Sequence, residues 1–132
     1  MENGKTVPAT IVPGATLDYE TDDYKVRALG RVTVVRLKNP NLTSALEVNR
    51  ITDEIKGMID SGILKLVLCF KHVEHCGSAG LGMMIAINKK IKDAGGRLVL
   101  SHPENIEELL RISKTASMFK IASDPKAAVH LF

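Results

Sequence analysis

The sequence contains few of the residues that stack on nucleic-acid bases and no stretch suited to crossing a membrane. It has no tryptophan, and aromatic residues make up only 4% of its 132 positions. No apolar run approaches the roughly 18 residues of a transmembrane helix. The N-terminal residues lack the basic start and apolar stretch of a signal peptide. We therefore expect no stacking platform for direct nucleic-acid binding, no membrane segment and a cytoplasmic location.

Cysteine is scarce as well. Cys69 and Cys76 are close together in the sequence, unlike the cysteines of a disulfide framework. With His72 and His75 they form a C-x2-H-x2-H-C pattern. However, Cys69 lies within an apolar run, and adjacent ligands such as His75 and Cys76 suit a closed tetrahedral site poorly. We expect neither a metal nor another cofactor.

Charge is distributed unevenly in a chain whose composition, 45% hydrophobic and 25% charged with a net charge of +3, is typical of one globular domain. Residues 1–23 contain five acidic residues and one lysine, whereas residues 24–132 contain 17 Lys or Arg and 10 Asp or Glu. Because residues 1–17 also contain two prolines and two glycines without periodicity, we predict a flexible acidic arm over residues 1–23. A single basic domain, residues 24–132, follows, and its charge could attract anionic partners.

Strand-like and helix-like segments alternate in residues 24–132. The segment YKVRALGRVTVVRL predicts a hairpin around Gly30. Leu64–Phe70 is apolar at nearly every position, which is typical of a central parallel strand covered on both faces. Further strands are predicted at residues 97–101 and 118–122. The order predicts an α/β fold in which helices flank a mixed β-sheet.

Helices are predicted between these strands. Thr43 or Ser44 can cap the first helix, in which Leu46, Ile51, Ile55, Met58 and Ile59 recur near helical spacing. A second helix is predicted over residues 79–94 and a third from Pro103, in its first turn, to Ile112. Ser123 or Asp124 can cap a terminal helix that starts at Pro125.

The most specific segment is HCGSAGLGMM, residues 75–84, between a predicted strand and a predicted helix. Functional sites of open α/β sheets gather at such joints, outside the C-terminal ends of the strands. Ser78 is a preferred N-cap residue, and we expect it to cap the helix while remaining exposed. A phosphate on a serine at this position would meet the positive end of the helix.

Two other interpretations of this segment, a hydrolase nucleophile and a nucleotide-binding loop, are poorly supported. Cys76-Gly77-Ser78-Ala79-Gly80 approximates the nucleophile elbow of hydrolases, with Asp93 or Asp124 and then His130 as possible partners. The chain is short for that fold, however, and has no HGGG-like oxyanion loop. The glycines at 77, 80 and 82 invert the dinucleotide fingerprint and lack a P-loop lysine. We do not expect an enzyme.

The chain from about Tyr24 to its end, and most strongly residues 64–112, resembles the anti-sigma factor antagonists, the STAS domains of bacterial partner-switching systems. Their mark is a strand, the motif D-S-[ST]-G-L-G, a helix ending in G-G and another strand. By resemblance, the phosphoacceptor serine falls on Ser78, and Gly80, Leu81 and Gly82 match the Gly-Leu-Gly. Gly77 replaces the usual aspartate and Ala79 the second hydroxyl residue. Leu42 and Thr43 stand where the family has an acidic residue.

The resemblance implies a regulator without catalysis of its own. A partner that is both anti-sigma factor and serine kinase would phosphorylate Ser78, and a phosphatase would reset the switch. The unphosphorylated form would bind the partner and free the sigma factor. The loop and phosphate would be supported by Gly77, Ala79, Gly80, Leu81 and Gly82. The alternative is a non-phosphorylated STAS interaction module, either a scaffold or a small-ligand binder.

A helical wheel predicts where a partner would dock. At 100° per residue, Leu81, Met84, Ile85, Asn88 and Ile91 fall on the side that should face the sheet. Met83, Ile87 and Lys90 fall on the other side or its flank. We predict that these three residues, with the loop around Gly77, form an exposed partner-binding face. Truncation of Met83 or Ile87 would then hardly change the stability.

Overall fold

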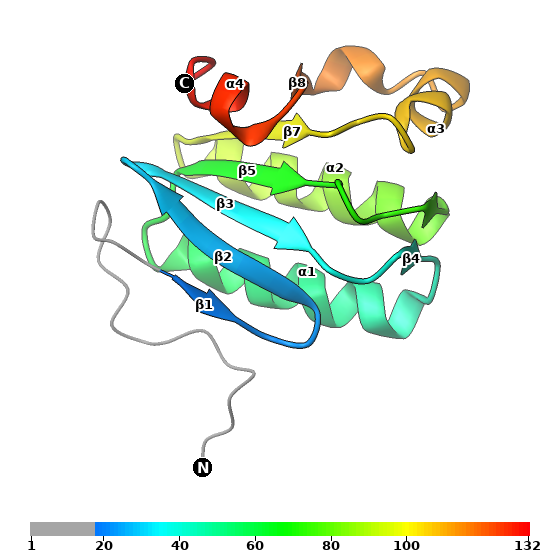
Figure 1. The fold of residues 1–132 in the computed structure, drawn as a ribbon, viewed down its shortest axis with the longest axis horizontal. Helices are drawn as coiled ribbons and strands as arrows, with labels where there is room; N and C mark the ends of the chain where they lie inside the picture. The colour runs from blue at the N-terminus through cyan, green and yellow to red at the C-terminus, as the bar shows by residue number, and fades with distance from the viewer. Residues whose placement is uncertain (1–17) are drawn as a thin grey trace.

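A six-stranded mixed sheet forms the centre of the fold (Figure 1). The computed structural model describes residues 18–132. In spatial order, the strands are β1 (Tyr19–Glu20), β2 (Tyr24–Leu29), β3 (Val32–Leu37), β5 (Lys65–Cys69), β7 (Arg97–Ser101) and β8 (Lys120–Ala122). The first three are antiparallel neighbours, whereas β3, β5, β7 and β8 run parallel. The predicted mixed sheet, its hairpin and its central strand are confirmed.

Two helices cover one face of this sheet and a short helix packs on the other. Helices α1 (Ala45–Asp60) and α2 (Ser78–Asp93) lie side by side behind the sheet in Figure 1. Helix α4 (Pro125–Val129) packs against β5, β7 and β8 on the opposite face. Helix α3 (Glu107–Ile112) and a 3₁₀ turn (Ala116–Met118) connect β7 to β8. None of the helices in residues 18–132 has the length and apolarity to span a bilayer.

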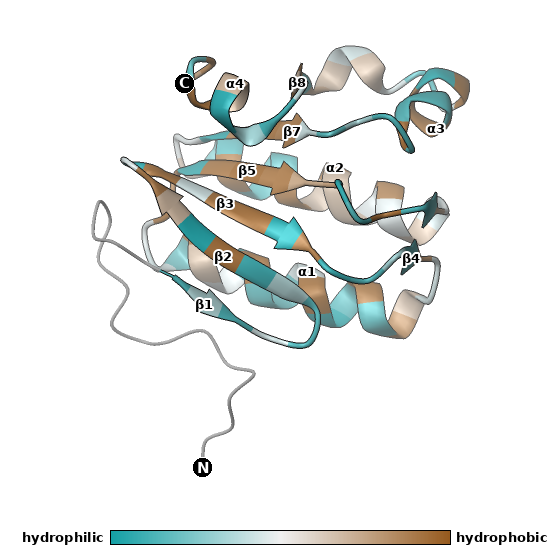
Figure 2. Cartoon of the chain, viewed as in Figure 1, coloured by the Kyte–Doolittle hydropathy of each residue, from teal (hydrophilic) through white to brown (hydrophobic). Residues whose placement is uncertain are grey.

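Alternation along the strands sorts side chains between the two faces. Strand β5 is apolar after its first residue, Lys65, while β2 alternates between apolar and polar residues (Figure 2). Leu66 and Leu68 belong to the large core beneath α1 and α2, and Val67 and Cys69 belong to a smaller core beneath α4. The central strand is therefore buried on both sides from Leu66 to Cys69, which explains why these four residues are all apolar.

Helix boundaries follow capping residues where the sequence supplies them. Ser44 accepts from the backbone N–H of Glu47 and caps α1, and Asp124 accepts from that of Ala127 at 2.8 Å and caps α4. Helix α3 starts later than the predicted Pro103. The carbonyl of Pro103 accepts from the N–H groups of both Ile106 and Glu107, so residues 104–106 form a turn before the helix.

The sheet begins earlier than the boundary predicted at residue 23. Residues 1–17 of the predicted arm lie outside the described residues, but β1 pairs with β2, with Glu20 opposite Lys25. Asp23 is held by Arg50 of α1 through two hydrogen bonds of 2.9 and 2.8 Å. The acidic residues at the end of the predicted arm therefore belong to the folded unit.

Candidate functional site

Ser78 lies where the chain returns from the central strand and enters α2. After β5, the chain forms β6 (His75–Cys76), which pairs in parallel with β4 (Asn41–Leu42) in a separate two-stranded sheet. The N–H of Gly77 then donates to the Leu42 carbonyl at 3.2 Å. Ser78, the next residue, is the first of α2 and is exposed. The predicted exposure of Ser78 at the helix start is confirmed.

Ser78 does not cap α2 as predicted. The N-cap residue is Gly77, with φ −102° and ψ −163°, and no side chain accepts from the first turn of the helix. The reason is that Gly77 is still extended and bound to β4, so helical dihedrals start at Ser78. Within residues 18–132 the Ser78 hydroxyl forms no hydrogen bond, and it is available to another molecule.

The first turn of α2 presents unpaired backbone donors beside this hydroxyl. The first helical hydrogen bond runs from the N–H of Leu81 to the Gly77 carbonyl at 3.1 Å. The N–H groups of Ser78, Ala79 and Gly80 precede it and have no partner in the helix. Together they carry about half a positive charge. An anionic group attached to Ser78 would therefore meet favourable dipoles.

The glycines of the motif have different structural roles. Gly80 is buried against β4 and β6: a Cβ atom there would overlap Cys76 Sγ and lie 3.3 Å from both the Cβ and the carbonyl oxygen of Leu42. Gly82 is exposed, with no heavy atom within 4 Å of such a Cβ. Gly80 therefore allows α2 to pack closely against β4 and β6, while Gly82 places no side chain on the surface next to Ser78.

Cys76 is a neutral, packed thiol. Burial raises its pKa to about 11, and its Sγ lies 3.9 Å from the Gly77 carbonyl. Because the thiolate is the form that attacks and binds metals, the group is suited to packing under α2. No three His, Cys, Asp or Glu residues between positions 18 and 132 lie close enough together to hold a metal ion.

The residues considered for a catalytic triad are not assembled around Ser78. Asp93 is at the opposite end of α2, which is roughly 22 Å long, and it pairs with Lys89. Asp124 caps α4, and His130 ends that helix across the sheet from α2. None of these three residues is therefore placed to act as a general base for Ser78.

The prediction that Met83 and Ile87 form part of an exposed partner-binding face on α2 is wrong. Met83 is 2% exposed and Ile87 fully buried, and both lie in the large core. Because α2 packs against α1 as well as against the sheet, its buried stripe also includes residues that the helical wheel assigned to the solvent side. Lys90 is partly exposed, and its ammonium lies 2.8 Å from the Asp60 carboxylate of α1.

The prediction of which α2 residues face the sheet is confirmed only in part. Met84, Asn88 and Ile91 are buried, whereas Leu81 and Ile85 are half-buried at the edge of the same core. The true buried stripe of α2 consists of Gly80, Met83, Met84, Ile87, Asn88 and Ile91.

An exposed leucine near the site was not recognised from the sequence. Leu46 is 81% exposed in the first turn of α1, although the other apolar residues of its predicted stripe are buried. The starts of α1 and α2 lie at the same end of the molecule, next to β4 and β6 (Figure 1). Leu46 and Ile51 are five positions apart, whereas residues on one helix face recur every three or four positions. This spacing was the signal in the sequence that Leu46 lies outside the buried stripe.

Comparison with known proteins identifies relatives of this arrangement. A family model described as the STAS domain matches residues 23–128. BtrV of Bordetella bronchiseptica, named as a candidate anti-sigma factor antagonist, is 25% identical over 92 residues, which are 69% of this chain and 79% of BtrV. A Thermotoga maritima protein described in the same way is 26% identical, with a TM-score of 0.61 over 88% of this chain and 92% of that one.

Bacillus SpoIIAA has the same fold. Its phosphorylated form superposes with a TM-score of 0.64 and 19% identity, over 83% of this chain and 99% of that one. The anti-sigma factor antagonist SpoIIAA is also known in its unphosphorylated form, with the same TM-score.

Proposed function

Since the chain belongs to the STAS domain family, we propose that it acts as an anti-sigma factor antagonist that phosphorylation of Ser78 switches off. The observation that supports this best is the exposed Ser78 at the start of α2, which the resemblance to the family motif makes the candidate acceptor. Its partner would be an anti-sigma factor with serine kinase activity, and a phosphatase would reverse the modification. In this proposal the protein acts in the cytoplasm.

The chemistry of the modification favours a switch at a surface over a refolding event. A phosphate adds about −1.5 to −2 charges at neutral pH. Its attraction to the helix end contributes about 0.3–1 kcal/mol, which is small compared with the stability of a domain. The added charge and volume would therefore act on a partner that covers Ser78.

The site differs from the family motif in a way that leaves one acceptor. Gly77 and Ala79 carry no polar side chain, so Ser78 provides the only hydroxyl of the motif. Without an aspartate at position 77, recognition by the kinase would rest on the hydroxyl, the backbone donors and the surrounding surface.

The surface around Ser78 offers a different anchor from the one predicted from sequence. Leu46 lies in the first turn of α1, which starts at the same end of the molecule as α2 (Figure 1), and it is far more exposed than Met83 or Ile87. Gly82, one helical turn after Ser78, is exposed and has no side chain that would stand between a partner and the surface of α2. We include Leu46, Ser78 and Gly82 in the docking surface, and exclude the buried Met83 and Ile87.

Calorimetric titration with the cognate anti-sigma factor kinase tests this function. The parent and Ser78→Ala should bind equally well, while Ser78→Asp should lose affinity on the order of tenfold, about 1.4 kcal/mol. Leu46→Ala should cost about 1–2 kcal/mol of binding without lowering the melting temperature. Lys120→Ala, an exposed change on the edge strand β8, is the control. Undiminished binding of Ser78→Asp would contradict the switch.

A further inference from the structure

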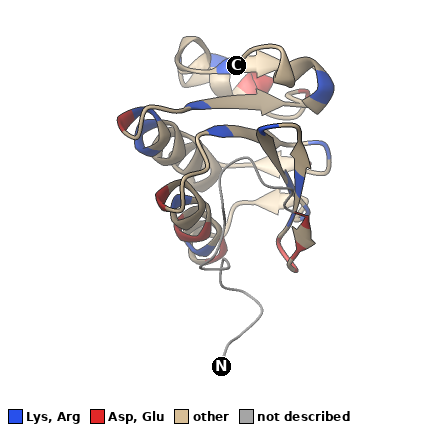
Figure 3. Cartoon of the chain, turned by 90° about the vertical axis from the view of Figure 1, so that its left-hand side faces the viewer, with Lys and Arg blue, Asp and Glu red and all other residues tan. Residues whose placement is uncertain are grey.

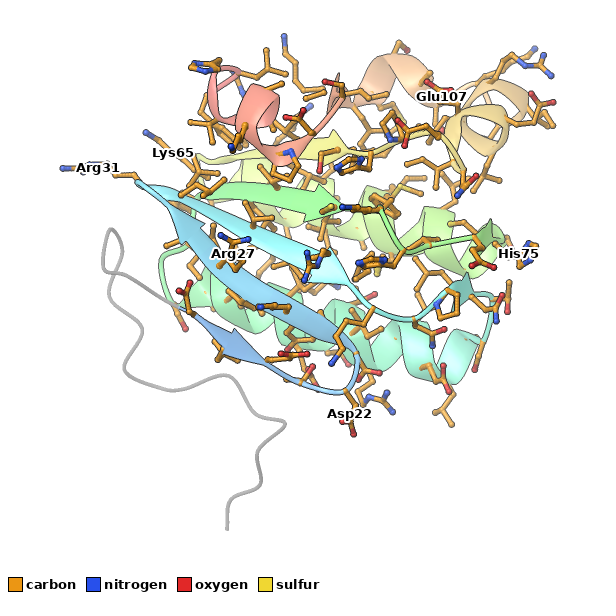
Figure 4. All side chains as sticks on the ribbon, viewed as in Figure 1. Asp22, Arg27, Arg31, Lys65, His75 and Glu107 are labelled. Atoms are coloured by element: carbon orange, nitrogen blue, oxygen red, sulfur yellow. The ribbon has the colours of Figure 1, made fainter. Side chains whose placement is uncertain are left out.

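The face of the sheet opposite α1 and α2 contains a cavity whose lining includes five Lys or Arg residues. Helix α4 packs on β5, β7 and β8 of this face, while Arg27 of β2 stays exposed. Figure 4 looks onto this face, with Arg27 labelled above β2. In the side view of Figure 3, Lys and Arg segments lie on the strands and their connections, with α1 and α2 on one side of the sheet.

The strand register places these cations next to one another. Lys25 of β2 pairs directly with Arg36 of β3, and Arg36 with Cys69 of β5, so the three side chains share a row on this face. Arg27, two residues after Lys25, pairs with Val34 in the neighbouring row. Like charges directly opposite each other destabilise a sheet, so the pair of Lys25 and Arg36 opposes folding.

A cavity of roughly 330 Å³ lies over these rows. Leu29, Val34 and Cys69 provide apolar lining. The charged lining consists of Lys25, Arg27, Arg36, Lys71 and Lys126 against the single carboxylate of Asp124, with His102 beside them. The cavity thus concentrates positive charge, since the whole chain carries a net charge of only +3.

The nearby carboxylates are already engaged. Asp124 accepts from the backbone N–H of Ala127 at 2.8 Å. Glu20, opposite Lys25 on β1, accepts from the ammonium of Lys38 at 2.6 Å.

The cations of the cavity lack partners. Within residues 18–132 no ion pair engages any of the five. The Nε of Arg36 is buried without a hydrogen-bond partner, and an unsatisfied buried donor costs about 1–3 kcal/mol.

We propose that this cavity binds a small organic phosphate, in which an anionic phosphate group is joined to an apolar body. The arginines offer planar forks that match phosphate oxygens, and the apolar lining would receive the rest of the ligand. The volume is at the lower end of the range for small-molecule sites, about 300–1,000 Å³. The cavity lies across the sheet from α2, so this site is independent of Ser78.

The test uses the full chain with phenyl phosphate as probe and with inorganic phosphate and benzoate for comparison. In a ¹⁵N NMR titration, phenyl phosphate should shift the amide signals of Lys25, Arg27 and Arg36 and leave that of Ser78 unchanged. It should bind more tightly than inorganic phosphate, which lacks the apolar body, and than benzoate, which lacks the phosphate. The absence of such shifts, or stronger shifts at Ser78, would overturn the proposal.

Two matched arginine variants separate a site from general attraction. Arg27→Gln should weaken phenyl phosphate binding about tenfold, the loss expected for one hydrogen bond to a charged group. Arg31→Gln makes the same charge change in the same hairpin, away from the cavity lining, and should change affinity less than about twofold. Equal losses in both variants would overturn the proposal, because they would reflect net charge alone.

Stability and vesicle binding complete the test. Lys25→Gln should change the melting temperature little, since it removes both the contact with the like-charge neighbour Arg36 and the contact with the opposite-charge neighbour Glu20, but it should weaken phenyl phosphate binding. A clear fall in melting temperature would mean that the cations serve the fold. Binding to vesicles containing phosphatidic acid without binding of phenyl phosphate would assign the face to a lipid surface and would likewise overturn the proposal.

Discussion

Replacing Gly80 by alanine should disturb the packing of α2 against β4 and β6 more than the same replacement at Gly77 or Gly82. The added Cβ would overlap Cys76 Sγ and lie 3.3 Å from the Cβ and carbonyl oxygen of Leu42, which is 1% exposed. The first turn of α2 must then move away from β4 and β6. Overpacking of this kind costs about 1–3 kcal/mol, or roughly 4–12 °C in the melting temperature of a domain of this size.

Gly82 provides a matched control two residues further along the same helix. A Cβ there meets no heavy atom within 4 Å, and alanine is better than glycine inside a helix by about 0.5–1 kcal/mol. Gly80→Ala should therefore destabilise the protein and Gly82→Ala should stabilise it. Thermal and urea unfolding followed by circular dichroism measures both changes.

A double variant identifies the atom responsible for the loss. If the overlap with Cys76 Sγ dominates, Gly80→Ala should cost much less stability when it is made in the Cys76→Ala variant than when it is made in the parent. A stability of Gly80→Ala equal to or above that of the parent would refute the close approach of α2 to the short sheet.

Three further predictions follow from burial and capping. Met83→Ala should lower the free energy of unfolding by about 2–5 kcal/mol because the side chain is in the core; a change below 0.5 kcal/mol in urea unfolding would contradict its burial. Gly77→Asp should raise stability by a few tenths of a kcal/mol, since aspartate caps a helix better than glycine and φ at this position is negative; an unchanged or lower melting temperature would contradict this cap. The pKa of Cys76, about 11 against the ordinary 9.0, should slow its alkylation at pH 8 about a hundredfold relative to the unfolded chain, and its contribution to stability should fall as the pH rises from 9 to 11; equal alkylation rates by mass spectrometry in native and denaturing buffer would contradict the burial.

The parts of the fold that could be predicted are those with a strong local signal. The run from Leu64 to Phe70, apolar at every position except Lys65, predicted a two-sided central strand, because a strand covered on both faces has few polar positions. Asp124 and Pro125 likewise predicted the start of α4, since a capping side chain and a fixed φ both favour that position.

The errors arose where the neighbours of an element decide its burial. Periodicity showed that α2 is amphipathic, but the centre of its buried stripe depends on how it is shared between α1 and the sheet, so Met83 and Ile87 were placed on the surface. The pairing of β4 with β6 involves two residues on each side and left no pattern in the sequence. Gly77 replaced Ser78 as N-cap because that pairing keeps position 77 extended.

The candidate site was only partly visible from the sequence. The motif located Ser78, because glycines and a strand-to-helix joint are local features. The cationic cavity was not predicted, since it depends on strand register: Lys25 and Arg36 are eleven positions apart and become neighbours only when β2 and β3 pair.

Mass spectrometry of the protein after incubation with its anti-sigma factor kinase and ATP tests the central claim most directly. The account predicts one added phosphate, assigned by fragmentation to Ser78 and absent from Ser78→Ala. Ser44, an exposed serine that caps α1 at the same end of the molecule, is the internal control and should remain unmodified. A phosphate on any other residue, or no phosphate on the parent under conditions in which the kinase is active, would contradict the assignment of Ser78 as the switch.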